Sequence, residues 1–245
     1  MHDLTPLPSA LLRERVSGSV DENWFIESGS RTIQDWTRAL AAVQVGFENA
    51  GAILDFGCGC GRTLSHLKAR LAPWQRLIGA DVDKDAIEWL TQNLPGAEAV
   101  LLPKVGPSSL EDRSIDLVVS QSVFTHLPED VQYIWLSELH RIIKPGGTLL
   151  TSIHGPKVAR EYHNIMLSIG DNFGADRFQR EYDRFGFSYF MRKTPAEESL
   201  PNYYGTTFHN IRYIEDNWLS TNFELKAYLP LASLCHQDIV ILTRV

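Results

Sequence analysis

The stretch that decides the fold is ILDFGCGCGR, residues 53–62. An apolar run containing Asp55, followed by glycines at 57, 59 and 61, predicts a buried parallel strand, a tight turn and the start of a helix. Glycine has no Cβ, so it adopts positive φ and lets a ligand come close to the backbone. We therefore expect unpaired N–H groups at a helix N-terminus here, which suit an anionic group such as a carboxylate.

Two classes of cofactor compete for this loop. The dinucleotide fingerprint needs a glycine at position 62, where this chain has Arg62. What remains is Asp55-x-Gly57-x-Gly59-x-Gly61, which resembles the glycine-rich first motif of the class I S-adenosylmethionine-dependent methyltransferases.

Three later stretches extend the resemblance in the family's order, so that it covers about residues 51–155. They are LIGADVDKDAI (77–87), IDLVVSQSVFTHL (115–127) and LHRIIKPGGTLLTSIHG (139–155). The resemblance implies an α/β, Rossmann-like, doubly wound seven-stranded sheet, mostly parallel, with an antiparallel C-terminal hairpin. It also implies S-adenosylmethionine as cofactor and S-adenosylhomocysteine as product.

The predicted cofactor contacts centre on two acids. Asp81 ends the second strand, where an acid can accept both ribose hydroxyls, although Asp81 or Asp83 could instead cap the next helix. Asp55 either binds the amino group of the cofactor through water or only fixes the loop. The loop after the third strand lacks the acid that many relatives have, so adenine contacts there must be backbone or apolar. The full predicted set is Asp55, Gly57, Cys58, Gly59, Gly61, Arg62, Asp81, Val82, Ser120 and Gln121.

Histidines are the candidates for a general base. His154 closes the fifth strand at the ligand-binding edge and is the first candidate, with His126 and His209 behind it. The alternative for His154 is a hydrogen-bonded histidine at a strand end, and the alternative for His126 is a structural role. Displacement at an activated sulfonium methyl needs mainly alignment and exclusion of water, so a base is not obligatory.

Additions flank the predicted core. We expect an N-terminal helical lid (1–48), a cofactor-binding core (49–156), a helical substrate-recognition insert (157–220) rich in aromatic residues, and closing strands of the core (221–245). In the lid and the insert, aromatic residues suit an organic ligand and arginines suit a carboxylate, although most of the aromatics are expected to be packing. The predicted substrate contacts are Tyr203, Tyr204, Trp24, Phe25, Arg15, Arg31 and Arg212.

Composition sets the outer bounds. The 245 residues carry a net charge of −7 without a lysine- or arginine-rich run, which argues against a nucleic-acid substrate. No apolar run is long enough to cross a membrane, three cysteines make no disulfide framework, and no metal-binding spacing is present, so we expect a cytoplasmic protein without a metal.

The sequence thus predicts methyl transfer to a small molecule, most simply to a hydroxyl or carboxylate oxygen. The alternatives are a protein or RNA methyltransferase and a non-catalytic S-adenosylmethionine-binding module. The oligomeric state stays open.

Overall fold

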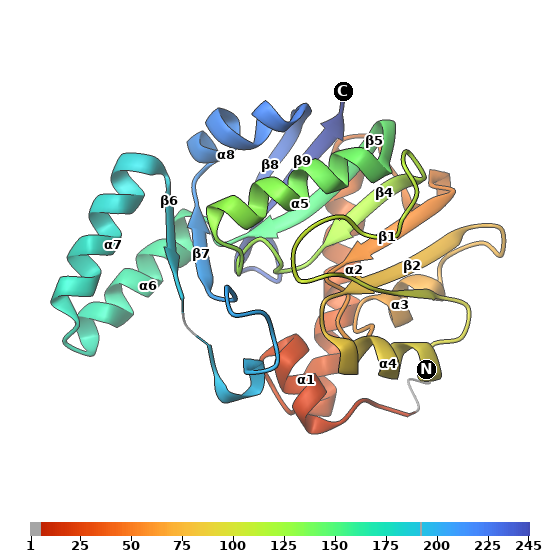
Figure 1. Ribbon diagram of the computed structural model, residues 1–245, viewed down its shortest axis with the longest axis horizontal. Helices are drawn as coiled ribbons and strands as arrows, with labels where there is room; N and C mark the ends of the chain where they lie inside the picture. The colour runs from red at the N-terminus through yellow and green to blue at the C-terminus, as the bar shows by residue number, and fades with distance from the viewer. Residues whose placement is uncertain (1–5, 192) are drawn as a thin grey trace.

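A seven-stranded sheet forms the centre of the protein, in the order β3-β2-β1-β4-β5-β9-β8 (Figure 1). The structure is a computed structural model that describes residues 6–191 and 193–245. Its first five strands are parallel, whereas β9 is antiparallel to β5 and β8. This arrangement confirms the predicted Rossmann-like class. The strands are β1 (Ala52–Phe56), β2 (Arg76–Asp81), β3 (Glu98–Leu101), β4 (Ile115–Ser120), β5 (Ile143–Ile153), β8 (Phe223–Ser233) and β9 (Gln237–Arg244).

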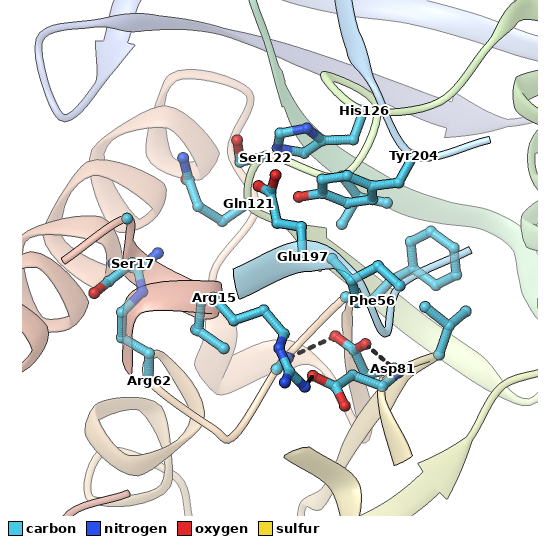
Figure 2. Close-up of a pocket in the computed structure, with 18 of the residues that line it drawn as sticks. Arg15, Ser17, Phe56, Arg62, Asp81, Gln121, Ser122, His126, Glu197 and Tyr204 are labelled. Atoms are coloured by element: carbon cyan, nitrogen blue, oxygen red, sulfur yellow. Dashed lines mark hydrogen bonds and ion pairs between the residues drawn. The ribbon is translucent and has the colours of Figure 1, made fainter. Parts of the chain in front are cut away.

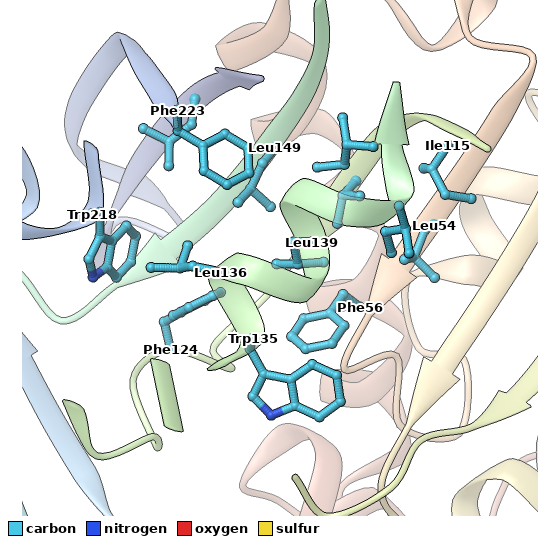
Figure 3. Close-up of a cluster of buried hydrophobic side chains, with 14 of the residues drawn as sticks. Leu54, Phe56, Ile115, Phe124, Trp135, Leu136, Leu139, Leu149, Trp218 and Phe223 are labelled. Carbon is cyan, nitrogen blue, oxygen red and sulfur yellow. The ribbon is translucent and has the colours of Figure 1, made fainter. Parts of the chain in front are cut away.

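Helices cover both faces of this sheet. On one face, α5 (Glu129–Ile142) presses Trp135 and Leu139 against Leu54 and Phe56 of β1 (Figure 3). The other face, which carries Ile53, is covered by α2 (Glu22–Ala42), α3 (Leu64–Lys68) and α4 (Lys84–Asn93). Alternate residues of one strand thus enter opposite cores, as a doubly wound sheet requires.

The strand order reverses between β1 and β4, and this reversal locates the site. The chain runs from β1 outward to β2 and β3, then returns to the other side of β1 with β4 and β5. In open α/β sheets the crevice outside the carboxyl ends of the strands at such a point is where ligands bind.

The predicted N-terminal lid divides into two parts with different positions. Helix α2 buries Ile33, Trp36 and Leu40 against the sheet, so it is a core helix. It begins at Glu22, where Asp21 caps it by accepting the Trp24 N–H. Helix α1 (Ala10–Ser17) lies over the carboxyl ends of the strands (Figure 1), and the first turns of α2 reach the same place through Trp24 and Ser28. Residues 1–5 of the predicted lid lie outside the described residues.

The predicted insert is not purely helical. Helices α6 (Pro156–Ser168) and α7 (Asn172–Phe185) form a hairpin beside the main body, and β6 (Phe187–Phe190) pairs with β7 (Thr206–His209). The hairpin packs around Phe178 and Phe208, so these aromatic rings serve packing. The last part, α8 (Ile211–Asn217) and the 3₁₀ turn η3 (Trp218–Thr221), returns to the core through Ile214 and Trp218.

Strand β7 ties the insert to the site edge of the sheet. The Thr207 N–H donates to the carbonyl of Thr125 (2.7 Å), and the His209 N–H donates to the carbonyl of His154 (2.9 Å). Just before the strand, the Gly205 N–H donates to the carbonyl of His126 (3.1 Å). Residues 203–205 are therefore held against the loop that follows β4.

Two local elements complete the fold around the glycine loop and the C-terminus. The helix after the glycine loop, α3, is a single short turn that ends at Lys68. The closing strands β8 and β9 form a hairpin with a turn between Ser233 and Gln237. Within residues 6–191 and 193–245, no helix is long and apolar enough to span a membrane.

Candidate active site

A cavity of about 380 Å³ lies at the carboxyl ends of β1, β2 and β4 (Figure 2). Its volume is within the range of roughly 300–1,000 Å³ that small-molecule sites occupy. We call two parts of its wall the glycine-loop half (Gly57, Gly59, Arg62, Asp81, Val82 and Leu102) and the histidine half (Gln121, Ser122, His126, Glu197, Tyr204 and Gln237). Helix α1 contributes Glu14, Arg15, Val16 and Ser17.

The glycine loop has the backbone that its sequence requires. Gly57, Gly59 and Gly61 have φ of +80°, +54° and +86°. A Cβ on Gly57 would lie 2.0 Å from Val123, and one on Gly59 would lie 2.5 Å from Val16 of α1. Glycine at these two positions therefore allows both the turn and the close seating of its neighbours.

The first three amides of the glycine loop are already paired. The amides of Gly57 and Cys58 donate to the carbonyl of Ala80, and the amide of Gly59 donates to Asp81 Oδ2 (2.7 Å). The loop folds back on β2 before a helix starts, so the expected unpaired N–H groups do not include these three. A cationic group beside the loop could therefore bind an anion here.

Arg62 is that group. Its side chain crosses under α2, where one terminal nitrogen donates to Ser28 Oγ (3.0 Å), and it lines the cavity with only 7% of its surface exposed. Its Nε has no hydrogen-bond partner in the part of the chain that the structure describes. Burial lowers the pKa of Arg62, and Asp55 partly opposes this effect. A buried guanidinium without a contacting carboxylate is suited to binding an anionic ligand.

Asp81 lies beside it and faces the cavity. Its two oxygens accept the N–H groups of Gly59 and Asp83, which fixes the carboxylate without using all its lone pairs. Burial raises its pKa to about 6. Asp83, in contrast, caps α4 by accepting the N–H groups of Asp85 and Ala86, so the capping alternative applies to Asp83. Val82 and Leu102 provide an apolar wall next to Asp81.

Four predicted contacts of this half lie behind the cavity wall. Asp55 is fully buried, accepts a hydrogen bond from the Thr63 hydroxyl, and has its pKa raised to about 7 by burial, which favours the role of fixing the loop. Cys58 is buried and its thiol donates to the carbonyl of Gly59. Gly61 packs against Leu90, and Ser120 is buried at the end of β4. None of the four is among the residues that line the cavity.

His126 is the histidine that reaches the cavity. Its Nδ1 lies 2.7 Å from the carbonyl oxygen of Gly205, which assigns the proton to Nδ1 and leaves the Nε2 lone pair free. The ring stacks on Tyr204 with centroids 4.3 Å apart and planes 12° apart. Burial lowers the pKa of His126, so the imidazole is neutral at pH 7.

His154 and His209 lie outside the cavity. His154 is one layer behind His126, with ring centroids 6.4 Å apart, and its Nδ1 contacts the carbonyl of Thr207. His209 is fully buried and its Nε2 contacts Gln132, whose amide in turn donates to the carbonyl of Leu127. Burial lowers the pKa of both rings to about 3. His209 therefore supports the loop that carries His126, and His154 corresponds to the strand-end alternative.

A polar network continues the histidine half. Gln237 Nε2 donates to Ser122 Oγ (2.8 Å), and its Oε1 accepts from Ser152 and from Gln121. Ser122 has φ of +60°, an uncommon value for a non-glycine residue that often marks a functional site. The network fixes the amide groups at the end of β4.

The predicted substrate contacts separate into three groups. Trp24, Tyr203 and Tyr204 line the cavity, whereas Phe25 is buried against Leu12. Arg15 also lines it, but it is held by Asp83 (2.5 Å) and donates from Nε to the carbonyl of Ala196 (3.0 Å). Arg31 and Arg212 do not line the cavity, and each pairs with an acid four positions away on its own helix, Glu27 and Asp216.

Sequence reasoning did not find several cavity residues. Glu197 lies on the 3₁₀ turn η2 (Pro195–Glu197), Leu234 lies in the turn between β8 and β9, and Gln237 is the first residue of β9. No local pattern marks these positions, because only the fold of the insert and the C-terminal hairpin brings them to the site. The expectation of apolar contacts after β3 could have named Leu102.

The chain is similar in sequence to known methyltransferases. Residues 54–151 match a family described as a methyltransferase domain. A probable S-adenosylmethionine-dependent methyltransferase of Mycolicibacterium smegmatis is 30% identical over 149 residues, which are 60% of this chain and 52% of the relative. A probable thiol methyltransferase of Arabidopsis thaliana is 25% identical over 175 residues, 65% of this chain and 76% of the relative.

A solved structure has the same fold. The S-adenosylmethionine-dependent methyltransferase of Methanosarcina mazei aligns with a TM-score of 0.55 at 19% identity, covering 79% of this chain and 92% of that one. Among the curated relatives, this chain spans about half the length of the mycobacterial one. The similarity is therefore concentrated in the sheet and its glycine loop.

Proposed function

Because this chain belongs to the class I S-adenosylmethionine-dependent methyltransferases, we propose that it transfers the cofactor's methyl group to the hydroxyl oxygen of a small molecule. The observation that carries the proposal is one cavity whose wall joins Asp81 and Arg62 at one end to neutral His126 at the other. One end fits the cofactor, and the other end fits the acceptor.

The residues of the glycine-loop half fit the cofactor. The positive charge of buried Arg62, which lines the cavity, suits the carboxylate of the methionyl part, and the spare lone pairs of Asp81 suit the two ribose hydroxyls. Val82 and Leu102 offer an apolar surface for the adenine ring. When bound, S-adenosylmethionine supplies a methyl group on a positively charged sulfur that is already activated for displacement.

His126 is our proposed general base. A hydroxyl placed at its Nε2 would give up its proton to that nitrogen as its oxygen bonds to the methyl carbon and the S–C bond breaks, which would leave S-adenosylhomocysteine as the product. The Nδ1 contact with Gly205 and the stacking on Tyr204 hold the ring in one orientation. Leu200 and Tyr204 from the insert, together with α1, shield this part of the cavity from water.

A hydroxyl acceptor is favoured over a carboxylate. Carboxylate recognition calls for a free guanidinium near the base, but Arg15 is already held by Asp83 and Ala196. Arg31 and Arg212 do not line the cavity. The remaining cavity arginine, Arg62, belongs to the glycine-loop half.

A small acceptor is favoured over a protein or RNA. The cavity is covered by α1 and by residues 197–204 of the insert, and the chain has a net charge of −7. An RNA substrate would call for a basic rim. We also propose a cytoplasmic location, in keeping with the free cysteines 58, 60 and 235.

The test is methyl transfer from labelled S-adenosylmethionine into a size-fractionated extract of the source cells, preceded by calorimetric titration of S-adenosylhomocysteine. We expect cofactor binding and label in a small-molecule fraction whose mass spectrum places the methyl on oxygen. Label on sulfur or nitrogen would show that the acceptor atom is not oxygen. Label only in protein or RNA would show that the chain is a protein or RNA methyltransferase. Cofactor binding without transfer to any fraction would favour the non-catalytic module.

A further inference from the structure

Glu197 places a carboxylate beside the proposed base. It ends η2 in the insert and lines the cavity between Tyr204 and Arg15 (Figure 2). One of its oxygens, Oε2, accepts the Thr194 N–H (2.7 Å), which fixes the turn. The other oxygen is available to a ligand. Its negative charge acts on both His126 and Tyr204, which places it in the histidine half.

No cation within residues 6–191 and 193–245 pairs with Glu197. The two cationic side chains of the cavity are already assigned. Arg15 pairs with Asp83, and Arg62 donates to Ser28 at the far end. A half-buried carboxylate next to a neutral imidazole thus lacks the positive partner that such a group usually has.

The histidine half carries one carboxylate and no cationic side chain. The whole cavity wall carries four carboxylates, Glu14, Asp81, Asp83 and Glu197, against the guanidinium groups of Arg15 and Arg62. Asp83 is neutralised by Arg15, and Asp81 with Arg62 belongs to the glycine-loop half. The charge of Glu197 therefore makes the histidine half electronegative, which attracts a cation and repels an anion.

Aromatic rings border the same space. Trp24 and Tyr204 line the cavity, and Tyr204 is fixed by its stacking on His126. The faces of Trp and Tyr rings attract ammonium groups, most strongly where water is excluded. A carboxylate with aromatic rings on the cavity wall is a binding environment for an organic cation.

We propose that the acceptor is an amino alcohol or aminophenol: a small molecule whose protonated amine is bound by Glu197 while its hydroxyl lies at Nε2 of His126. This inference rests on the proposed hydroxyl methylation at the same site. Glu197 is then a specificity-determining residue, and it excludes acidic acceptors of the same shape.

The test uses three probes that share one phenol: tyramine, which carries an ammonium, tyrosol, which is neutral, and para-hydroxyphenylacetate, which carries a carboxylate. Each is titrated by calorimetry into protein saturated with S-adenosylhomocysteine. We expect tyramine to bind more tightly than para-hydroxyphenylacetate by about 10- to 100-fold, with tyrosol between them. Equal binding, the reverse order, or no binding of tyramine would overturn the inference.

Two variants isolate the charge of Glu197. Glu197→Gln keeps an oxygen that can accept the Thr194 N–H, so the turn is preserved while the charge is lost, and we expect the preference for tyramine over tyrosol to disappear. Glu198→Gln changes the same charge at the next position, where the side chain is exposed and outside the cavity, and should keep the preference.

Cofactor affinity separates this inference from the proposed function. If Glu197→Gln weakens binding of S-adenosylhomocysteine tenfold or more, Glu197 binds the amino group of the cofactor, and the inference fails while the proposed function stands. If the unaltered protein does not bind S-adenosylhomocysteine, the proposed function fails first. Unchanged cofactor affinity together with a lost tyramine preference supports both.

Discussion

The two halves of the cavity are built in opposite ways. The glycine-loop half comes from one stretch of chain, residues 57–82, with Leu102 added from the loop after β3. The histidine half is assembled from segments near residues 121–126, 197–204 and 237, which meet only in the folded protein. The first half is therefore a local motif, whereas the second is a product of tertiary structure.

This difference predicts how each half responds to change. The glycine-loop half is held by the backbone of adjacent strands, such as the bond from the Gly59 amide to Asp81. The histidine half depends on long-range contacts, such as that between His126 Nδ1 and Gly205, which are 79 positions apart. Substitutions should therefore separate cofactor binding from turnover.

The largest effect is expected for His126→Gln. Removing the general base should lower kcat on the order of 10²- to 10³-fold, while the dissociation constant of S-adenosylhomocysteine stays within about twofold. The measurement is methyl transfer to the acceptor fraction found by labelling, together with calorimetry.

The pH profile distinguishes a base from a merely structural histidine. Because burial lowers the pKa of His126, its neutral form prevails at pH 7, and kcat/KM should fall only as the pH drops below 6.5. This acidic limb should vanish in His126→Gln. The matched control is His154→Gln, one layer behind, for which we expect less than about a fivefold change in kcat. A larger loss at His154 than at His126 would reverse the assignment of the base.

Asp81→Asn should have the next largest effect, confined to the cofactor. The amide keeps the shape but loses the negative charge that strengthens hydrogen bonds from two hydroxyls, so cofactor affinity should fall by about 100-fold. Calorimetry with S-adenosylhomocysteine measures it. Glu88→Gln on α4, an exposed acid paired with Lys84, is the control and should leave the affinity unchanged. If Asp81→Asn bound normally, Asp81 would serve only the backbone of Gly59 and Asp83.

The same contrast explains what the sequence could reveal. The glycine positions and Asp81 are set by spacing along one strand-turn-helix unit, so reading the residues in order located them. The sheet order followed from the family pattern and from the strand-like C-terminus. Even in this half, the N–H groups of Gly57 and Cys58 were expected to be unpaired. They donate to the carbonyl of Ala80 on the next strand, and the local sequence does not reveal this tertiary contact.

The histidine half was far less predictable. His126 and His154 both lie at strand ends, and nothing in their spacing tells which ring turns toward the cavity. The structure decides it through Gly205, which orients one ring, and Thr207, which holds the other. Glu197 lies in a 3₁₀ turn and Gln237 begins β9, and neither position carries a motif, so no local signal could have placed them in the same half as His126.

Asp55→Asn tests the glycine-loop half through stability, with an expected pH-dependent change of about 4 kcal/mol in the free energy of unfolding. Burial raises the pKa of Asp55 from 3.8 to about 7, so the folded state holds this proton more tightly than the unfolded state. The contribution is therefore complete below about pH 4 and is lost as the pH rises to about 7. Asp55→Asn mimics the protonated form, so its free energy of unfolding relative to the unaltered protein should rise over this range. Urea titrations at several pH values measure the difference, and a constant difference would mean that Asp55 stays ionised throughout.

The smallest effect, about tenfold, is expected for Arg15→Met, and it asks whether the two halves are independent. Arg15 on α1 contacts both: it pairs with Asp83 next to the glycine-loop half, and it donates to the carbonyl of Ala196 beside Glu197. Losing it should weaken binding of S-adenosylhomocysteine and of tyramine together and should speed amide hydrogen exchange in α1 and η2. Arg31→Met, at an arginine of α2 that pairs with Glu27 outside the cavity, should change none of these. If only cofactor binding weakened, α1 would stabilise the glycine-loop half alone, and Arg15 would not connect the two halves.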